Sequence, residues 1–332
     1  MNESLITSQP TPPQPMPVAT ARVPAARSNL YQLDAATCEL LTASAPLMAE
    51  WSRSECKAKS RGGMEQWAKK QNESANGSPP LSCDWYHGTW QYMRLLNMVA
   101  VPPWYGFYGR ALGSLLSKKP QARVLISACA DCGMLATLHQ AIVASGATPS
   151  IVVCDICATP LLNAGWYAKR HGFTIECICD NILTSSSLAP GSFDLIVTDE
   201  FLTVLPASDK PAAVARWKEL LKPGGALVTT AMVGGATTPA LRKRYAERAR
   251  HLLRETNGDR RIATNGVDEL MERADRFAQF HTRHMIVEEG EIRRLFSDFY
   301  LGFLASTATP GECVNPTHSF QIVATLPRRA AG

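Results

Sequence analysis

The chain has 332 residues, of which 45% are hydrophobic, and a formal net charge of +5. This length suits one large core, or one domain with an accessory layer. No apolar run reaches the roughly 18 residues that a membrane span needs. The polar N-terminus also lacks the apolar core of a signal peptide, so we expect a cytoplasmic protein without membrane contact.

The first third of the chain predicts a tail followed by a helical layer. Residues 1–28 are rich in proline and poor in large apolar side chains, which is typical of a disordered tail. Residues 29–119 show helical periodicity, first after Asp34, which suits an N-cap, and again around Trp51. This helical layer ends in a run of aromatic residues between 85 and 108.

From residue 120 onwards the pattern alternates between strands and helices. Thr159 and Pro160 suit the cap and the first position of one of these helices. Such alternation predicts a parallel sheet with helices on both faces. The predicted strands are 123–128, 150–154, 174–179, 193–198, 226–231, 300–306 and 319–326, and the predicted helices are about 132–145, 160–171, 207–221, 241–252 and 266–283.

Acidic side chains lie at the ends of successive predicted strands. Asp155, Asp180 and the pair Asp199-Glu200 each follow one strand. Because the carboxyl ends of parallel strands form one edge of the sheet, where open α/β folds bind ligands, we expect these carboxylates at a ligand site. Carboxylates repel a pyrophosphate but suit a ligand with ribose hydroxyls, an amino group and a positive charge. S-adenosylmethionine (SAM) has all three.

Two segments carry a resemblance to a known family. The strand Phe-Asp-Leu-Ile-Val at 193–197 precedes Leu-Leu-Lys-Pro-Gly-Gly-Ala-Leu-Val at 220–228. In this order and spacing, the chain resembles the class I SAM-dependent methyltransferases over residues 121–327. The resemblance implies an α/β fold, with a seven-stranded, mostly parallel Rossmann-like sheet, an antiparallel C-terminal strand and an N-terminal helical lid. It divides the chain into a disordered tail (1–28), a helical lid (29–119) and a SAM-binding domain (120–332).

The resemblance also implies cofactor contacts at the sheet edge. Asp155, about 20 residues after Gly133, holds the position of the ribose partner. The turn after the first strand departs from the family, because Ser127 replaces an acid and Cys129 and Asp131 replace two glycines. Asp131 is then expected to face the SAM amino group. A helix cap or a simple turn is the alternative role for such acids. The predicted cofactor-binding residues are Ser127, Ala128, Asp131, Gly133, Asp155, Ile156, Asp180, Asn181, Asp199 and Glu200.

The aromatic run predicts a lid over the cofactor. Aromatic faces within about 6 Å of a sulfonium stabilise its positive charge, and a closed lid excludes water. Core packing is the alternative for part of the run, since Trp90, Met93 and Leu96 share helical spacing. The predicted lid and pocket residues are Tyr86, Trp90, Trp104 and Tyr105, and the predicted catalytic residues, as proton acceptors, are Tyr86, His87 and Asp199.

Six of the ten cysteines lie between residues 129 and 179. Two C-x-x-C pairs can build a zinc site, yet these pairs straddle the strand ends that the cofactor should occupy. We therefore interpret them as reduced thiols that fill small gaps, and we predict no metal. The pairs are Cys129/Cys132, Cys154/Cys157 and Cys177/Cys179.

These features favour methyl transfer from SAM to a small molecule in a closed, aromatic-walled pocket. One alternative consumes SAM differently, closing its amino acid part on itself and releasing methylthioadenosine, as azetidine-2-carboxylate synthases do. Another is nucleic-acid modification guided by residues 242–261, where eight Lys or Arg accompany three acids. A solvated helix face is the plainer interpretation of that segment. A scaffold without catalysis is a further alternative, and the acceptor and the oligomeric state stay open.

Overall fold

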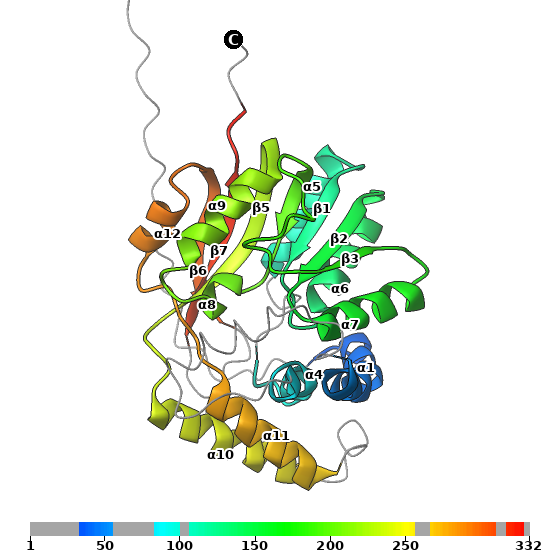
Figure 1. Cartoon of the computed structure of the whole chain (residues 1–332), viewed down its shortest axis with the longest axis vertical. Helices are drawn as coiled ribbons and strands as arrows, with labels where there is room; N and C mark the ends of the chain where they lie inside the picture. Colours follow the sequence, from blue (N-terminus) through cyan, green and yellow to red (C-terminus); the bar gives the residue numbers. More distant parts are fainter. Residues whose placement is uncertain (1–32, 56–82, 100–105, 256–265, 310–316, 329–332) are drawn as a thin grey trace, which may run out of the picture. The chain divides into compact units, whose positions relative to one another are not determined.

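The computed structural model describes residues 33–55, 83–99, 106–255, 266–309 and 317–328 (Figure 1). The predicted tail, 1–28, and two predicted pocket residues, Trp104 and Tyr105, lie outside these ranges. Within the ranges, no helix combines the length and the apolarity that a membrane crossing demands.

A seven-stranded sheet lies at the centre of the described chain, with the strand order β3-β2-β1-β4-β5-β7-β6. Strands β1 to β5 pair in parallel, and β7 runs antiparallel to both of its neighbours, β5 and β6. The predicted fold class is therefore confirmed. The strands are β1 (Arg123–Ser127), β2 (Ser150–Asp155), β3 (Glu176–Cys179), β4 (Phe193–Val197), β5 (Leu221–Val233), β6 (Tyr300–Ala308) and β7 (His318–Thr325).

Helices cover both faces of the sheet, because successive side chains of a strand point to opposite sides. Val124 and Ile126 of β1 pack with α5, α6 and α7, whereas Leu125 packs with α8, α9 and α12 on the other face. All five residues of β4 are buried, as expected for a parallel strand between two helical layers. These helices are α5 (Gly106–Lys118), α6 (Gly133–Ser145), α7 (Ala158–Arg170), α8 (Phe201–Val204), α9 (Lys210–Leu220) and α12 (Glu289–Leu295).

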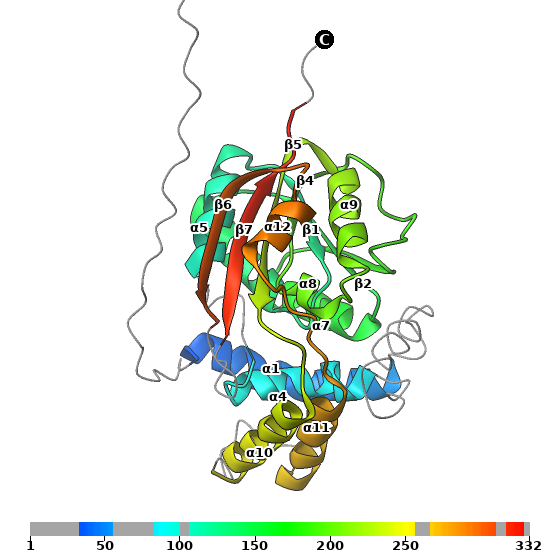
Figure 2. The ribbon, with the colours of Figure 1, turned by 90° about the vertical axis from the view of Figure 1, so that its left-hand side faces the viewer.

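The remaining described helices lie beyond the carboxyl ends of the parallel strands, and we call them the cap (Figures 1 and 2). Their apolar side chains form one cluster. The cap consists of α1 (Ala35–Ser54), the 3-10 turn η1 (Cys83–Trp85), α4 (His87–Leu95), α10 (Pro239–Glu255) and α11 (Val267–Phe280).

The cap does not follow the predicted boundary between 29–119 and 120–332. Helix α5, predicted as part of the lid, packs on the sheet instead. Helices α10 and α11, predicted as part of the SAM-binding domain, pack with α4. Figure 2 shows α1 and α4 as a layer between the sheet and the α10–α11 pair. The cap is therefore built from one segment before β1 and another after β5.

A buried ion pair joins the two halves of the cap. Arg273 of α11 donates to the Asp84 carboxylate of η1 at 2.7 Å, and Ser52 of α1 donates to the same carboxylate at 2.9 Å. Gly88 leaves the space that this requires, since a Cβ there would lie 2.6 Å from Asp84 Oδ1. The pair links segments 189 residues apart in the sequence.

Helix α1 differs from the two helical stretches predicted around Asp34 and Trp51. It is one helix of 20 residues with Pro46 inside it. The predicted N-cap is confirmed, because the Asp34 carboxylate accepts a hydrogen bond from the Thr37 N–H at 2.8 Å. Buried side chains such as Met48 pack α1 into the cap, and this packing offsets the hydrogen bond that proline cannot donate.

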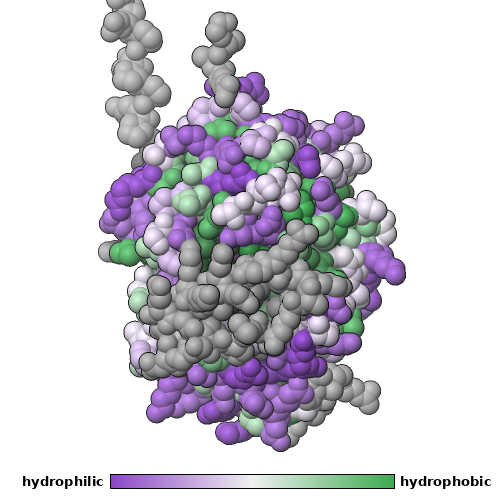
Figure 3. Space-filling view, viewed as in Figure 1, coloured by the Kyte–Doolittle hydropathy of each residue, from purple (hydrophilic) through white to green (hydrophobic). Residues whose placement is uncertain are grey.

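Part of the basic segment 242–261 lies in α10 and serves the cap. Arg242 donates to the carbonyls of Ala278 and Gln279, at the C-terminal end of α11, where a positive charge is favourable. Arg250 pairs with Asp275 of α11. Hydrophilic side chains cover the outer face of this helix pair (Figure 3). Two of the basic residues thus have structural partners within the cap.

Candidate active site

Asp155 connects two loops at the edge of the sheet. Its Oδ2 accepts a hydrogen bond from the Cys129 N–H at 3.0 Å, in the turn after β1. Its Oδ1 accepts one from the Cys157 N–H at 2.8 Å, directly before α7. Because α7 begins at Ala158, Thr159 lies inside the helix, and the prediction of Thr159 as its cap is wrong. The Asp155 carboxylate is held by backbone on both sides.

Asp131 is buried in a pair with a residue that the sequence analysis did not single out. Its Oδ2 accepts a hydrogen bond from Arg94 Nη1 of α4, and its Oδ1 accepts one from the Gly133 N–H at 2.8 Å. A Cβ on residue 133 would lie 2.9 Å from Asp131 Oδ1 and 3.0 Å from Arg94 Nη1. Glycine is therefore needed at this point of the turn to admit the guanidinium.

A chain of buried polar groups continues from this pair through the cap. Gln91 of α4 donates to Asp131 Oδ2 at 3.2 Å and to Asn163 Oδ1 of α7 at 3.3 Å. Asn163 Oδ1 also accepts the Cys132 N–H at 2.7 Å, and Ser44 of α1 donates to Gln91 Oε1 at 2.7 Å. The cap is thus connected to the turn after β1 and to α7 by hydrogen bonds shielded from water.

Two carboxylates follow β4. Asp199 Oδ1 accepts hydrogen bonds from Tyr108 Oη of α5 at 2.8 Å and from Thr230 Oγ1 of β5 at 2.7 Å. Glu200 has a positive φ of 53°. Its two oxygens accept hydrogen bonds from Ser319 of β7 and from Thr203 of α8, each at 2.8 Å. Four elements of the fold therefore fix this acidic pair.

Burial and mutual repulsion perturb the titration of the acidic pair. Burial raises the pKa of Asp199, although its two hydroxyl donors oppose the shift. Burial and the Asp199 charge together raise the pKa of Glu200 to about 7. Burial and the same charge raise the pKa of the Tyr108 phenol well above its ordinary value. Near neutral pH, the group poised to exchange a proton is Glu200.

Tyr86 lies where the cap meets the sheet edge. Its ring stacks on Phe277 of α11 at a centroid distance of 5.9 Å and lies 5.3 Å from Trp90 and 4.9 Å from His87. Burial raises the pKa of its phenol well above the ordinary value, with further contributions from the charges of Asp155 and Asp131. The Tyr86 hydroxyl therefore stays protonated near neutral pH.

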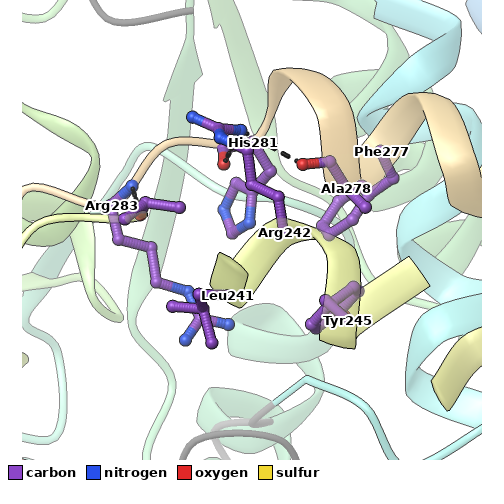
Figure 4. A pocket seen from close by; sticks show the side chains of 8 residues that line it. Leu241, Arg242, Tyr245, Phe277, Ala278, His281 and Arg283 are labelled. Atoms are coloured by element: carbon purple, nitrogen blue, oxygen red, sulfur yellow. Dashed lines mark hydrogen bonds between the residues drawn. The ribbon is translucent and has the colours of Figure 1, made fainter. Parts of the chain in front are cut away.

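A small cavity of about 20 Å³ opens within the cap, between α10, α11 and the segment after α11 (Figure 4). His281 lies on this cavity, and its imidazole pKa is lowered well below its ordinary value by burial and by the charges of Arg283 and Arg242. The His281 ring is also 5.8 Å from that of Tyr86. The cavity is lined by Thr237, Leu241, Arg242, Tyr245, Phe277, Ala278, His281 and Arg283.

Residues 124–225, from β1 to the Gly-Gly turn inside β5, match the model of a family described as "Methyltransferase domain". Over these residues the chain is similar to a methyltransferase domain, and we use that term for residues 124–225. No protein of curated function matches the sequence.

Solved structures similar to the methyltransferase domain come from several organisms. A SAM-dependent methyltransferase from Methanosarcina mazei is 17% identical, with a TM-score of 0.44, covering 64% of this chain and 95% of its own. The N-methyltransferase NodS from Bradyrhizobium japonicum, in complex with S-adenosyl-L-homocysteine, is 17% identical, with a TM-score of 0.42 and coverages of 72% and 99%. The 1,6-didemethyltoxoflavin-N1-methyltransferase from Burkholderia thailandensis is 14% identical, with a TM-score of 0.41 and coverages of 66% and 78%. The chemistry of this chain has to be argued from its own residues.

Several residues predicted as cofactor contacts have partners inside the methyltransferase domain. Ser127 is fully buried, and its hydroxyl accepts a hydrogen bond from Trp217 Nε1 at 2.9 Å. Asp180 accepts the Asn181 N–H, and Asn181 Oδ1 accepts the Leu183 N–H, which is the geometry of a turn. These bonds do not occupy every lone pair of Asp180 and Asn181, so their contact with adenine stays a prediction.

Two further residues predicted to contact the cofactor are Ala128 and Ile156. Ala128 has a positive φ of 62° at the tight turn after β1. Ile156 packs against Cys83 and Cys157, beneath the start of α4. The residues that the sequence analysis missed are Arg94 and Gln91 of α4 and the Asp199 partners Tyr108 and Thr230. Gln91 and Arg94 are three residues apart, so they share a helix face. This spacing is the sequence feature that could have identified them as a pair.

Proposed function

We propose that this chain binds SAM at the carboxyl edge of the sheet and transfers the methyl group to a small molecule beneath the cap. The observation that carries the proposal is the Asp155 carboxylate, which two backbone N–H groups orient at the end of β2. A carboxylate has two acceptor oxygens, one for each of the two vicinal ribose hydroxyls. Asp155 is also about 20 residues beyond the turn at Gly133, as a ribose partner should be.

The cap supplies the surroundings that a sulfonium requires. Tyr86, Trp90 and Phe277 form an aromatic group in the cap, and the charges of Asp155 and Asp131 act on Tyr86. Aromatic faces attract a cation, and a dry enclosure strengthens that attraction. SAM supplies an activated methyl group, and these residues hold the two reactants in line and exclude water. Of the predicted pocket residues, Tyr86 and Trp90 support this role.

The pKa of Glu200 makes it the group that we assign to accept a proton from the methyl acceptor. Its pKa of about 7 matches the requirement for a general base near neutral pH. The buried Tyr86 phenol keeps its proton and suits a hydrogen-bond donor better than a base. Asp199 is held by Tyr108 and Thr230, and its charge contributes to the raised pKa of Glu200. We therefore assign the base to Glu200 and retain Asp199 as its neighbour in catalysis.

The Asp155→Ala variant should bind SAM more weakly by about 1–3 kcal/mol, or roughly 5- to 150-fold, because it loses a charged partner of the ribose. Isothermal titration calorimetry measures this directly. Asp298→Ala, which removes an exposed carboxylate paired with Lys218, is the matched control and should bind as the wild type does. Wild-type affinity in a folded Asp155→Ala protein would remove the basis of the assignment.

Product analysis tests the reaction itself. The purified chain is incubated with SAM alone and with SAM plus a panel of small amines, phenols and thiols, and the products are read by mass spectrometry. We expect S-adenosylhomocysteine, and only when an acceptor is present. Enzyme-dependent formation of methylthioadenosine from SAM alone would show that the reaction is cyclisation and not methyl transfer. In cyclisation the amino nitrogen displaces methylthioadenosine at the γ-carbon.

Two further features support a small-molecule enzyme of the cytoplasm. Arg242 and Arg250 already have partners in the cap, which reduces the case for a nucleic-acid surface on α10. The eight cysteines in the described part of the chain are thiols, which is typical of a reducing compartment. Methylation of RNA or DNA, but of no small molecule, would reverse this part of the proposal.

A further inference from the structure

A group of soft donor atoms lies beneath the cap, apart from the carboxylates. The Sγ atoms of Cys83 and Cys157 and a ring nitrogen of His87 lie within 4.8 Å of one another, and all three residues are buried. In the described part of the chain, no other three His, Cys, Asp or Glu residues meet in this way. The C-x-x-C pairs weighed from the sequence do not form such a group.

Three separate elements deliver these side chains. Cys83 begins η1, and His87 begins α4 four residues later, so one helical turn places both on the same side. Cys157 comes from the loop after β2, two residues beyond Asp155. Thr159 Oγ1 lies 3.2 Å from Cys83 Sγ, where its hydroxyl can orient a ligating sulfur.

We propose that Cys83, His87 and Cys157 bind a zinc ion that fastens the cap to the loop after β2. Two thiolates and one imidazole are the donor set that zinc prefers. With bonds of about 2.3 Å to sulfur and about 2.0 Å to nitrogen, tetrahedral zinc needs donor atoms roughly 3.5–4 Å apart. Small side-chain rotations bring a group within 4.8 Å to that spacing. The fourth position takes a water molecule.

Charge balance favours zinc at a buried position. Two thiolates cancel the double charge of the ion, and the imidazole is neutral, so the complex as a whole carries no net charge into the interior. Ile156 packs against both cysteines and keeps the surroundings apolar. The ion would also fix Asp155, because the Cys157 N–H donates to its carboxylate. His87, predicted as a proton acceptor, is a ligand in this proposal and not a base.

Metal analysis of the full-length protein, purified without chelators, tests the proposal. We expect elemental mass spectrometry to find about one zinc ion per chain. After zinc is exchanged for cobalt, we expect a thiolate-to-metal charge-transfer band in the absorption spectrum. Cys83→Ser, Cys157→Ser and His87→Gln should each weaken zinc binding at least 10-fold in competition with a chromophoric chelator. Cys177→Ser, which changes an exposed thiol outside the group, should retain the metal.

Three results would overturn the proposal. One is wild-type protein that neither retains zinc nor gives the thiolate band with cobalt. The second is zinc binding that persists unchanged in Cys83→Ser and Cys157→Ser. The third is the loss of two hydrogens, reversed by reductant and mapped to Cys83 and Cys157, which would make the pair a disulfide. Because the cobalt spectrum is read on the wild type, a variant that fails to fold does not leave the question open.

Discussion

Replacing Arg94 by methionine should lower the free energy of unfolding by about 3–5 kcal/mol, the usual cost of leaving one charge of a buried pair alone. Arg94 and Asp131 are almost fully buried, with side chains 1% and 5% exposed. Methionine preserves much of the side-chain volume but none of the donors. Urea unfolding at pH 7 measures the loss, which should be the largest among the single substitutions that we predict.

Two further variants identify the cause of that loss. Arg293→Met removes the same side chain from an exposed ion pair with Glu289 and should cost less than about 1 kcal/mol. Adding Asp131→Asn to Arg94→Met removes the stranded charge while retaining an acceptor for the Gly133 N–H, and it should recover part of the stability. An Arg94→Met protein within 1 kcal/mol of the wild type would show that the pair is not closed in solution.

Glu200→Gln should lower the turnover number by roughly 10²- to 10⁴-fold, the usual contribution of a general base. Wild-type activity should rise with pH through about 7, as Glu200 loses its proton, and this limb should vanish in the variant. Glu176→Gln, on the exposed end of β3, is the matched control and should leave the turnover number unchanged. A wild-type pH profile in Glu200→Gln would assign the base elsewhere.

The same variant should be more stable than the wild type at alkaline pH. The folded pKa of Glu200, about 7, is above its ordinary value of 4.5, so the folded state binds more protons than the unfolded state between these two values. Stability therefore falls as the pH rises from about 4.5 to 7. Glutamine removes this penalty, so the gain should approach about 3 kcal/mol at pH 8 and be absent at pH 4.

Strands β1, β2 and β4 were predicted to within one residue, because their central residues are buried on both faces. Strand β5 begins five residues before its predicted start, and β3, which is partly exposed, begins two residues after its predicted start. Strands such as β1 and β4 then appear as continuous apolar runs, bounded by a turn on one side and a carboxylate on the other. The start of α7 was misplaced because Thr159 and Pro160 suit a helix start wherever it falls. The carboxylate that bonds the backbone there belongs to Asp155, two residues before the cap position.

The cap could not be predicted from local pattern, because its contacts join distant segments. Nothing near Asp84 in the sequence indicates that Arg273 is its partner. Arg94 likewise follows a run of aromatic residues, and an arginine in such a place is normally expected at the surface. Only the fold shows that Asp131 is its buried partner. The acids at the strand ends were found because one topology rule brings them to one edge. Their hydroxyl partners on α5, β5 and β7 could be identified only from the three-dimensional structure.

The contact between Ser319 and Glu200 has a consequence for synthesis on the ribosome. Ser319 is made 119 residues after Glu200, a delay of roughly 6 to 24 seconds at ordinary translation speeds. Strand β6 pairs with β7, and of these two strands only β7 pairs with β5, so both must be added to the growing sheet together. Until then Glu200 lacks the hydrogen bond that Ser319 donates to it in the finished fold. The surroundings of Glu200 are therefore completed only after the last two strands have been made.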